Sequence, residues 1–131
     1  DIVTRVKELT DGRGADVIYD PVGGDAFDAS THCINFEGRL IVIGFASGRI
    51  PEIKGHMILN KNMSVMGFFW TNYLFKRPDL VDDYQDEINR LYLEGKFPPV
   101  VSALMPMSDL PASLDMIMNR DAYGKIVLVN D

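Results

Sequence analysis

Gly38-Arg39-Leu40-Ile41-Val42-Ile43-Gly44-Phe45-Ala46-Ser47-Gly48 is the stretch that decides the fold of this chain. Residues Leu40–Gly44 are apolar, small or β-branched, which is typical of a strand buried on both faces of a parallel sheet. Ligands bind at the carboxyl ends of such strands in open α/β sheets, where glycine lets the backbone approach closely. The stretch predicts a central strand with a ligand at Gly44–Gly48. A tight turn without a ligand explains the same glycines, and the local sequence leaves both interpretations open.

The first third of the chain predicts a helix, a strand, a second helix and a second strand. Apolar residues recur at helical spacing in Asp1–Leu9, and Asp11-Gly12-Arg13-Gly14 then ends that helix. Ala15–Asp20 is a compact strand, and Asp25–Asn35 is a helix with an acidic residue as its cap or in its first turn. Glu37-Gly38 then predicts a turn into the strand that follows. Two short strands joined by a helix of this length are expected to lie parallel with a right-handed crossover. The predicted class is α/β.

The remaining elements are a short helix near Met57–Leu59, a strand at Met63–Phe69, a helix at Pro78–Glu94, a strand at Val100–Leu104, a helix capped by Ser108 and a strand at Gly124–Val129. Proline suits the first turn of the long helix, and Gly95 suits its end. The acidic residues of that helix predict a solvated outer face rather than a metal site, because nothing apolar or histidine-bearing encloses them: Asp82, Asp83, Asp86 and Glu87.

Length and composition favour a soluble globular protein, with residues 1–131 forming one domain. The chain has 131 residues, of which 47% are hydrophobic and 24% charged. No apolar run approaches the roughly 20 residues of a membrane span, and Asp1–Leu9 lacks the apolar core of a signal peptide. The single cysteine, Cys33, predicts no disulfide within the chain, no cysteine-rich zinc site and a cytoplasmic location. A net charge of −6 without a Lys/Arg cluster argues against nucleic-acid binding.

Few residues suggest catalytic chemistry, and no catalytic residue is predicted. His32 and His56 have no partner at metal-ligand spacing, so surface or packing roles are expected. Asp20 ends a strand, where it suits a ligand hydroxyl or a general base, but a cap for the following helix is favoured. The dense aromatic residues of Phe68–Phe75 indicate core or interface packing, with a wall for a flat ligand as the alternative.

The glycine-rich phosphate loop of a dinucleotide-binding fold is missing from these residues. That loop has the pattern Gly-x-Gly-x-x-Gly and follows the first strand of the fold. Gly12-Arg13-Gly14 precedes a strand instead, so it is not this loop. The chain alone predicts the later part of a nucleotide-binding fold without its phosphate loop.

Four blocks resemble, in order, the carboxyl-terminal cofactor-binding portion of the zinc-independent quinone oxidoreductases, a branch of the medium-chain dehydrogenase/reductase superfamily: Gly14–Gly24, Gly38–Gly48, Asn62–Gly67 and Gly124–Val129. The resemblance implies a partial Rossmann-like parallel sheet flanked by helices, lacking the first strands of the dinucleotide fold. It implies NADPH-dependent hydride transfer to a quinone or an enone-like carbonyl, without catalytic zinc. NAD(H) is not excluded, because the residues that read the ribose phosphate follow the missing second strand.

The resemblance also implies which residues border the cofactor. Val22 and Gly23 flank the ribose, and Lys125 approaches the phosphates. The nicotinamide is bordered by the loop after the central strand and by the backbone at the end of the next strand, which meets the carboxamide: Ile43, Gly44, Phe45 and Ala46, and then Gly67, Phe68 and Phe69.

The family's separate catalytic domain and glycine-rich loop have no counterpart in these residues. We therefore expect that the chain alone neither reduces quinones nor binds NADPH tightly. The resemblance implies a homodimer through Ser64–Phe68, and a bare edge at Ala15–Asp20 offers a second contact. A non-catalytic dimerisation or nucleotide-sensing module of the same fold is the alternative function.

Overall fold

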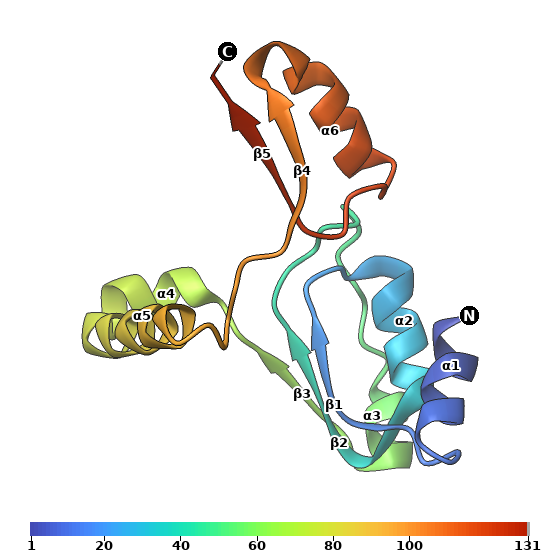
Figure 1. The fold of residues 1–131 in the computed structure, drawn as a ribbon. Coiled ribbons are helices and arrows are strands. Elements are labelled where there is room, and N and C mark those ends of the chain that lie inside the picture. Colours follow the sequence, from blue (N-terminus) through green and yellow to red (C-terminus); the bar gives the residue numbers. More distant parts are fainter. Residues whose placement is uncertain (131) are drawn as a thin grey trace. The chain divides into compact units, whose positions relative to one another are not determined.

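The computed structural model describes residues 1–130 (Figure 1). The chain divides into two compact units, Asp1–Pro78 and the residues from Asp79 onward. Each unit contains a parallel sheet and helices, so the predicted α/β class is confirmed. The organisation of residues 1–131 as one domain remains a prediction.

The first unit contains α1 (Ile2–Leu9), β1 (Ala15–Asp20), α2 (Gly24–Cys33), β2 (Ile34–Val42), α3 (Gly55–Lys61), β3 (Ser64–Gly67) and α4 (Trp70–Lys76). The three strands form a parallel sheet in the order β1-β2-β3, so β2 is central and β1 and β3 are its edges. Helix α1 begins as predicted, because the Asp1 carboxylate accepts a hydrogen bond from the backbone N of Val3 at 3.0 Å. The predicted central strand and its parallel neighbours are confirmed.

Strand β2 begins earlier than predicted, at Ile34 instead of after Gly38. Ala15 pairs with Ile34, but Val17 already pairs with Arg39, so β2 carries extra residues between these two pairs. Within this bulge Glu37 has a φ of 58°, and a Cβ on Gly38 would lie 2.9 Å from the carbonyl oxygen of Asn35. The glycine that predicts a turn before the strand instead permits a bulge within it.

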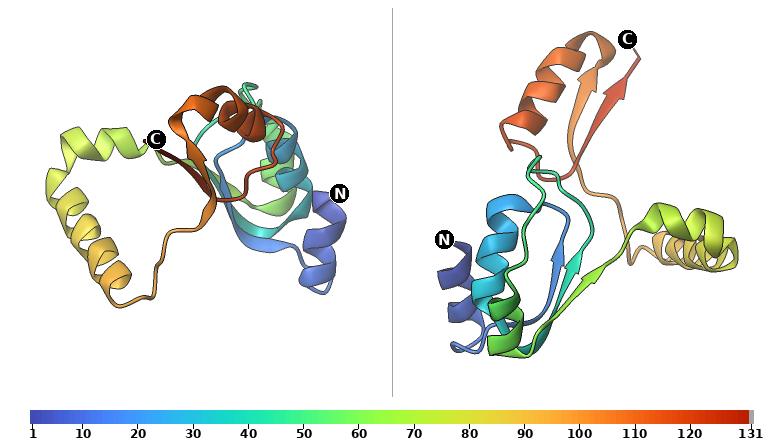
Figure 2. Two further views of the ribbon diagram at one scale, coloured as in Figure 1. Left: turned by 45° about the horizontal axis from the view of Figure 1, so that its top comes forward. Right: turned by 180° about the vertical axis from the view of Figure 1, so that it is seen from behind.

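Helices α2 and α3 lie against one face of this sheet, as both views of Figure 2 show. The core beneath them consists of Phe27, Ile34, Leu40 and Met63, all at most 4% exposed. Successive strand residues point to opposite faces, so the other face presents the row that pairs Tyr19 with Ile41 and Met66. Tyr19 is 65% exposed and Met66 is 50% exposed. This row is apolar and largely open to solvent within the unit, and the next row on the same face pairs Val17 with Arg39 and Ser64.

The second unit contains β4 (Val101–Pro106), the 3₁₀ turn η1 (Met107–Asp109), α6 (Leu110–Met118) and β5 (Lys125–Val129), together with α5 (Pro78–Leu93), whose first residue closes the first unit. Strands β4 and β5 pair in parallel in a sheet of their own. The predicted cap of α6 is wrong: Ser108 lies in η1, and Asp109 occupies the N-cap position. Pro111 suits the first turn of α6, because it has no backbone N–H to satisfy there.

The acidic face of α5 is solvent-exposed, as predicted: Asp82, Asp83, Asp86 and Glu87. Glu87 forms an ion pair with Arg90 at 2.6 Å, and hydrogen bonding to Arg90 lowers the pKa of the Glu87 carboxyl. Pairs of this kind on a helix surface contribute little to stability. This face of α5 is exposed to solvent, and its ion pair adds little to the stability of the fold.

Candidate functional site

The turn between β1 and α2 is held by a buried carboxylate. Asp20 is 3% exposed, and its Oδ1 accepts hydrogen bonds from the backbone N of Val22 and of Gly23, both at 2.9 Å. Gly23, and not Asp20, occupies the N-cap position of α2. The predicted cap is therefore corrected: Asp20 fixes the turn that precedes the helix. The result is a rigid loop at the carboxyl end of β1.

The loop after β2 lies against this turn along its length. Backbone hydrogen bonds run from the N of Ile43 to the O of Asp20 at 2.8 Å and from the N of Ala46 to the O of Pro21 at 3.1 Å. The N of Ser47 donates to the O of Val22 at 2.9 Å, and the N of Gly24 donates to the O of Arg49 at 3.0 Å. These bonds place the predicted ribose-flanking and nicotinamide-bordering loops side by side.

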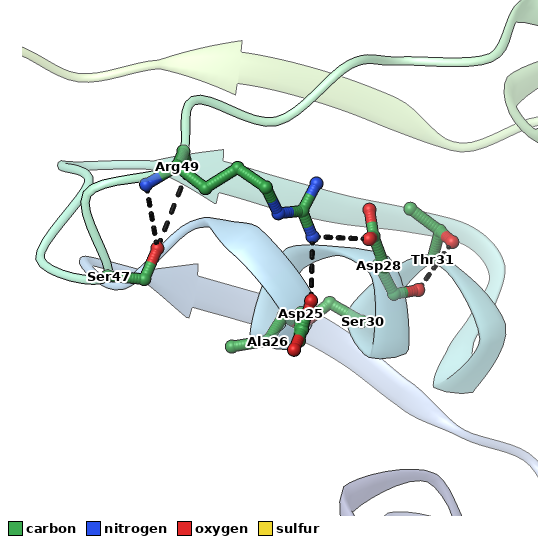
Figure 3. Close-up of polar contacts among 7 residues, drawn as sticks. All are labelled: Asp25, Ala26, Asp28, Ser30, Thr31, Ser47 and Arg49. Carbon is green, nitrogen blue, oxygen red and sulfur yellow. Dashed lines mark hydrogen bonds and ion pairs between the residues drawn. The ribbon is translucent and has the colours of Figure 1, made fainter.

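An exposed ion-pair cluster ties the same loop to α2 (Figure 3). One guanidinium nitrogen of Arg49, Nη2, lies 2.9 Å from Asp25 and 2.5 Å from Asp28. Hydrogen bonds to both carboxylates raise the pKa of Arg49, and the bond to Asp28 has the larger effect. Asp25 stands in the first turn of α2, as predicted. Because the cluster is exposed, its main effect is to restrict where the loop lies rather than to stabilise the fold.

Glycine is required where the two loops meet. Gly23 has φ 68° and ψ −155°, a conformation that is essentially restricted to glycine. A Cβ there would lie 3.0 Å from the carbonyl oxygen of Arg49 and 3.2 Å from the ring of Phe45. Gly24 has φ 53°, and a Cβ on it would lie 2.6 Å from the hydroxyl of Ser47. The Gly23-Gly24 pair thus permits the close approach of the two loops.

A cavity of about 400 Å³ opens at the carboxyl ends of β2 and β3. Its walls come from the ends of these strands, the loops that follow them and the first turn of α4: Val42, Ile43, Gly44, Phe45, Gly67, Phe68, Phe69 and Asn72. Seven of these eight residues are apolar or glycine. The volume falls within the range of small-molecule sites, which are lined mainly by hydrophobic and aromatic residues.

Most of the predicted cofactor-binding residues meet at this cavity. Six of them line it: Ile43, Gly44, Phe45, Gly67, Phe68 and Phe69. Val22, Gly23 and Ala46 lie in the two hydrogen-bonded loops beside it. Lys125 belongs to the second unit, where its backbone N donates to the O of Val100 at 2.7 Å. Its approach to the cofactor phosphates remains a prediction, as do the roles of the other residues.

The aromatic stretch after β3 forms a helix, α4, that the sequence pattern does not predict. Trp70 and Tyr73 stack with ring centres 5.8 Å apart, and the ring of Phe68 lies 5.2 Å from that of Tyr73 and 6.2 Å from that of Trp70. Two lining residues were not predicted from the sequence: Val42 at the end of β2, and Asn72 on this helix, which is the polar one. A single amide among aromatic neighbours is the only signal that points to it.

Neither a metal-binding cluster nor a membrane-spanning helix is found in the described part of the chain. Among residues 1–130, no three His, Cys, Asp or Glu side chains are grouped so that they could hold a metal ion. Cys33 is 1% exposed, and burial raises the pKa of its thiol. Over the same residues, no helix combines the length and the apolar character needed to cross a bilayer.

Comparison with known proteins gives consistent matches along the chain. A quinone oxidoreductase-like protein 2 homolog from Nematostella vectensis is 38% identical over 97% of the chain, and mouse quinone oxidoreductase-like protein 2 is 30% identical over 94%. The crystal structure of Escherichia coli quinone oxidoreductase complexed with NADPH superposes with a TM-score of 0.80 at 25% identity. That match covers 98% of this chain and 40% of the E. coli chain.

These matches confirm the resemblance to quinone oxidoreductases and the Rossmann-like character of the fold. The chain spans 35% of the length of each of the two quinone oxidoreductase-like relatives. The sequence profile described as "Zinc-binding dehydrogenase" matches residues 1–92, which is more than half of the chain. The chain therefore belongs to the zinc-binding dehydrogenase family.

Proposed function

We propose that this chain forms the carboxyl-terminal cofactor-binding part of an NADPH-dependent oxidoreductase that transfers hydride to a quinone or an enone-like carbonyl. The observation that carries the proposal is the cavity at the carboxyl ends of β2 and β3, because six residues singled out from the sequence line it. Membership of a family of oxidoreductases supports it. NADH remains the alternative cofactor.

The cavity fits a flat ring such as nicotinamide. Its walls are apolar, and no heavy atom lies within 4 Å of where a Cβ on Gly67 would stand, so a ring has room to approach the backbone there. A bound ring would cover apolar side chains that are partly exposed, among them Phe45 at 43% and Phe69 at 61%. NADPH, when bound, supplies the hydride.

The chain's own residues would act mainly by positioning. Ile43 and Phe45 border the ring, and the backbone of Gly67–Phe69 meets its carboxamide. The loop that Asp20 holds presents Val22 and Gly23 to the ribose, and Lys125 approaches the phosphates. Because the two loops are joined by backbone hydrogen bonds, the ribose and the ring are held by one rigid unit.

The same residues supply only part of a cofactor site, and we propose that the isolated chain is inactive. The Gly-x-Gly-x-x-Gly pattern that binds the pyrophosphate is missing from the 131 residues. The open apolar row that contains Tyr19 and Met66 is suited to burial against a further layer of the same fold. Isolated, the chain should bind NADPH more weakly than micromolar.

We also propose a homodimer through Ser64–Phe68. Strand β3 is an edge of the sheet, so its outer backbone groups are free to pair with a second copy. Strand β1, the other edge, offers a further contact through Ala15–Asp20. Light scattering at high protein concentration tests the proposal, and a monomer there would overturn it. A cytoplasmic location is proposed with it.

NADPH consumption by the full-length gene product tests the proposed function. NADPH and duroquinone, a fully methylated quinone to which thiols do not readily add, are mixed with the purified protein, and a simple enone serves as a second acceptor. Acceptor-dependent NADPH consumption supports the proposal. Tight NADPH binding without turnover of either acceptor would favour a nucleotide-sensing module instead. Calorimetric titration of the 131-residue chain with NADPH is the matched control, and micromolar binding there would refute the proposed weak binding by the isolated chain.

A further inference from the structure

Asn72 is the one polar side chain among the eight residues that line the cavity. It is exposed, and it makes no side-chain hydrogen bond within residues 1–130. An amide carries two N–H donors and one carbonyl acceptor. A small number of polar groups in an otherwise apolar site usually fix the orientation of the ligand. Asn72 is therefore the group in this cavity that is available to orient a ligand.

The neighbouring rings hold Asn72 in place at the cavity wall. The backbone N of Asn72 donates to the O of Phe69 at 3.0 Å, which links the residue to the lining segment before α4. Trp70 and Tyr73 stack on each other, and both lie against Phe68, which itself lines the cavity. Aromatic pairs of this kind add stabilisation beyond the area that they bury. The first turn of α4 is thereby fixed to the wall on which Asn72 stands.

We propose that the side-chain amide of Asn72 donates a hydrogen bond to a carbonyl oxygen carried by a flat ring in this cavity. The proposal rests on the proposed function and goes beyond it, since it assigns the orientation of the ligand in the cavity to one residue. Two ligands offer this chemistry: the carboxamide of nicotinamide and the ketone of a conjugated acceptor. No other side chain that lines the cavity is polar, so among the lining side chains Asn72 has no competitor for the ligand's carbonyl.

The test compares two variants of the full-length gene product with a matched control. Asn72→Leu removes both donors and the acceptor at similar size, and Asn72→Asp removes the donors while keeping acceptor oxygens. Thr71→Ala is the control, because Thr71 is exposed on the same helix and is not a lining residue. Circular dichroism melts show whether the variants fold like the wild type.

The two arms of the test separate the two ligands. The first is the Kd of NADPH without acceptor, and the second is the KM of duroquinone at saturating NADPH. Loss of one hydrogen bond predicts a roughly three- to tenfold increase in one of these constants for both Asn72 variants. A change in the first arm assigns the bond to the carboxamide, and a change in the second assigns it to the acceptor. Constants within twofold of the Thr71→Ala control in both arms would overturn the inference.

If the full-length product neither binds NADPH nor reduces an acceptor, the proposed function has failed. A direct binding measurement still tests the role of Asn72 in that case. Trp70 is the only tryptophan of the chain, and its ring lies against the cavity residue Phe68. Saturable quenching of its fluorescence by duroquinone or nicotinamide that weakens in Asn72→Leu supports the inference. Absence of saturable quenching in the wild type, or equal affinity in the variant, overturns it.

Discussion

Substitution of Gly23 by alanine is expected to separate the two loops that border the cavity. Gly23 has φ 68° and ψ −155°, and an alanine there costs about 1–3 kcal/mol in backbone conformation alone. The added Cβ would also lie 3.0 Å from the carbonyl oxygen of Arg49 and 3.2 Å from the ring of Phe45, both tighter than ordinary contact. Relieving these contacts requires movement of the loop after β2, which adds roughly 1 kcal/mol or more. The expected total is a loss of about 2–4 kcal/mol.

Gly48→Ala is the matched control, because it isolates the backbone cost. Gly48 also has a positive φ, 80°, but no heavy atom lies within 4 Å of its added Cβ. Its expected loss is about 1–2 kcal/mol. Both variants lie in the first unit and are compared by urea unfolding, followed by circular dichroism and by Trp70 fluorescence. Equal losses in the two variants would show that the loops are not in close contact at Gly23, and would refute this account of the site.

Two further substitutions test the core. Phe27→Ala should lower the free energy of unfolding by about 3–5 kcal/mol, because Phe27 is fully buried among Ile34, Leu40 and Met63, and a loss below 1 kcal/mol in urea titrations would contradict this core. Burial raises the pKa of the Cys33 thiol above its ordinary value near 9, so the folded protein keeps a proton that the unfolded chain loses. The free energy of unfolding should therefore be unaffected at neutral pH and fall as the pH rises past about 9. The urea midpoint of Cys33→Ala should not show this alkaline decrease. Identical pH profiles for the variant and the wild type would contradict this role of Cys33.

The helices and strands with strong local signals were predictable from the sequence. The boundaries of β1 match the prediction, and α5 begins at Pro78 as expected, with Gly95 at a φ of 71° just beyond its end. Helix α4 was not predictable, because it is seven residues long, lacks a side-chain cap and is rich in aromatic residues with modest helix propensity. Its first turn packs onto the ring of Phe68, which lies just before the helix, and this contact leaves no apolar periodicity in the sequence.

Non-local pairing accounts for the other differences. The separate sheet of β4 and β5 joins strands about 20 residues apart, and no local pattern states which sheet they enter. The bulge in β2 follows from its register against β1, so Gly38 reads locally as a turn. Asn72 becomes a cavity residue only because β2 and β3 are neighbours, which brings the ends of both strands beside the first turn of α4.

The most direct test of the central claim is a crystal structure of the full-length gene product grown with NADPH. We expect the nicotinamide ring to lie in the cavity at the ends of β2 and β3, against Ile43 and Phe45 on one side and Gly67–Phe69 on the other. Well-defined nicotinamide density elsewhere in the protein, with this cavity left to solvent, would contradict it.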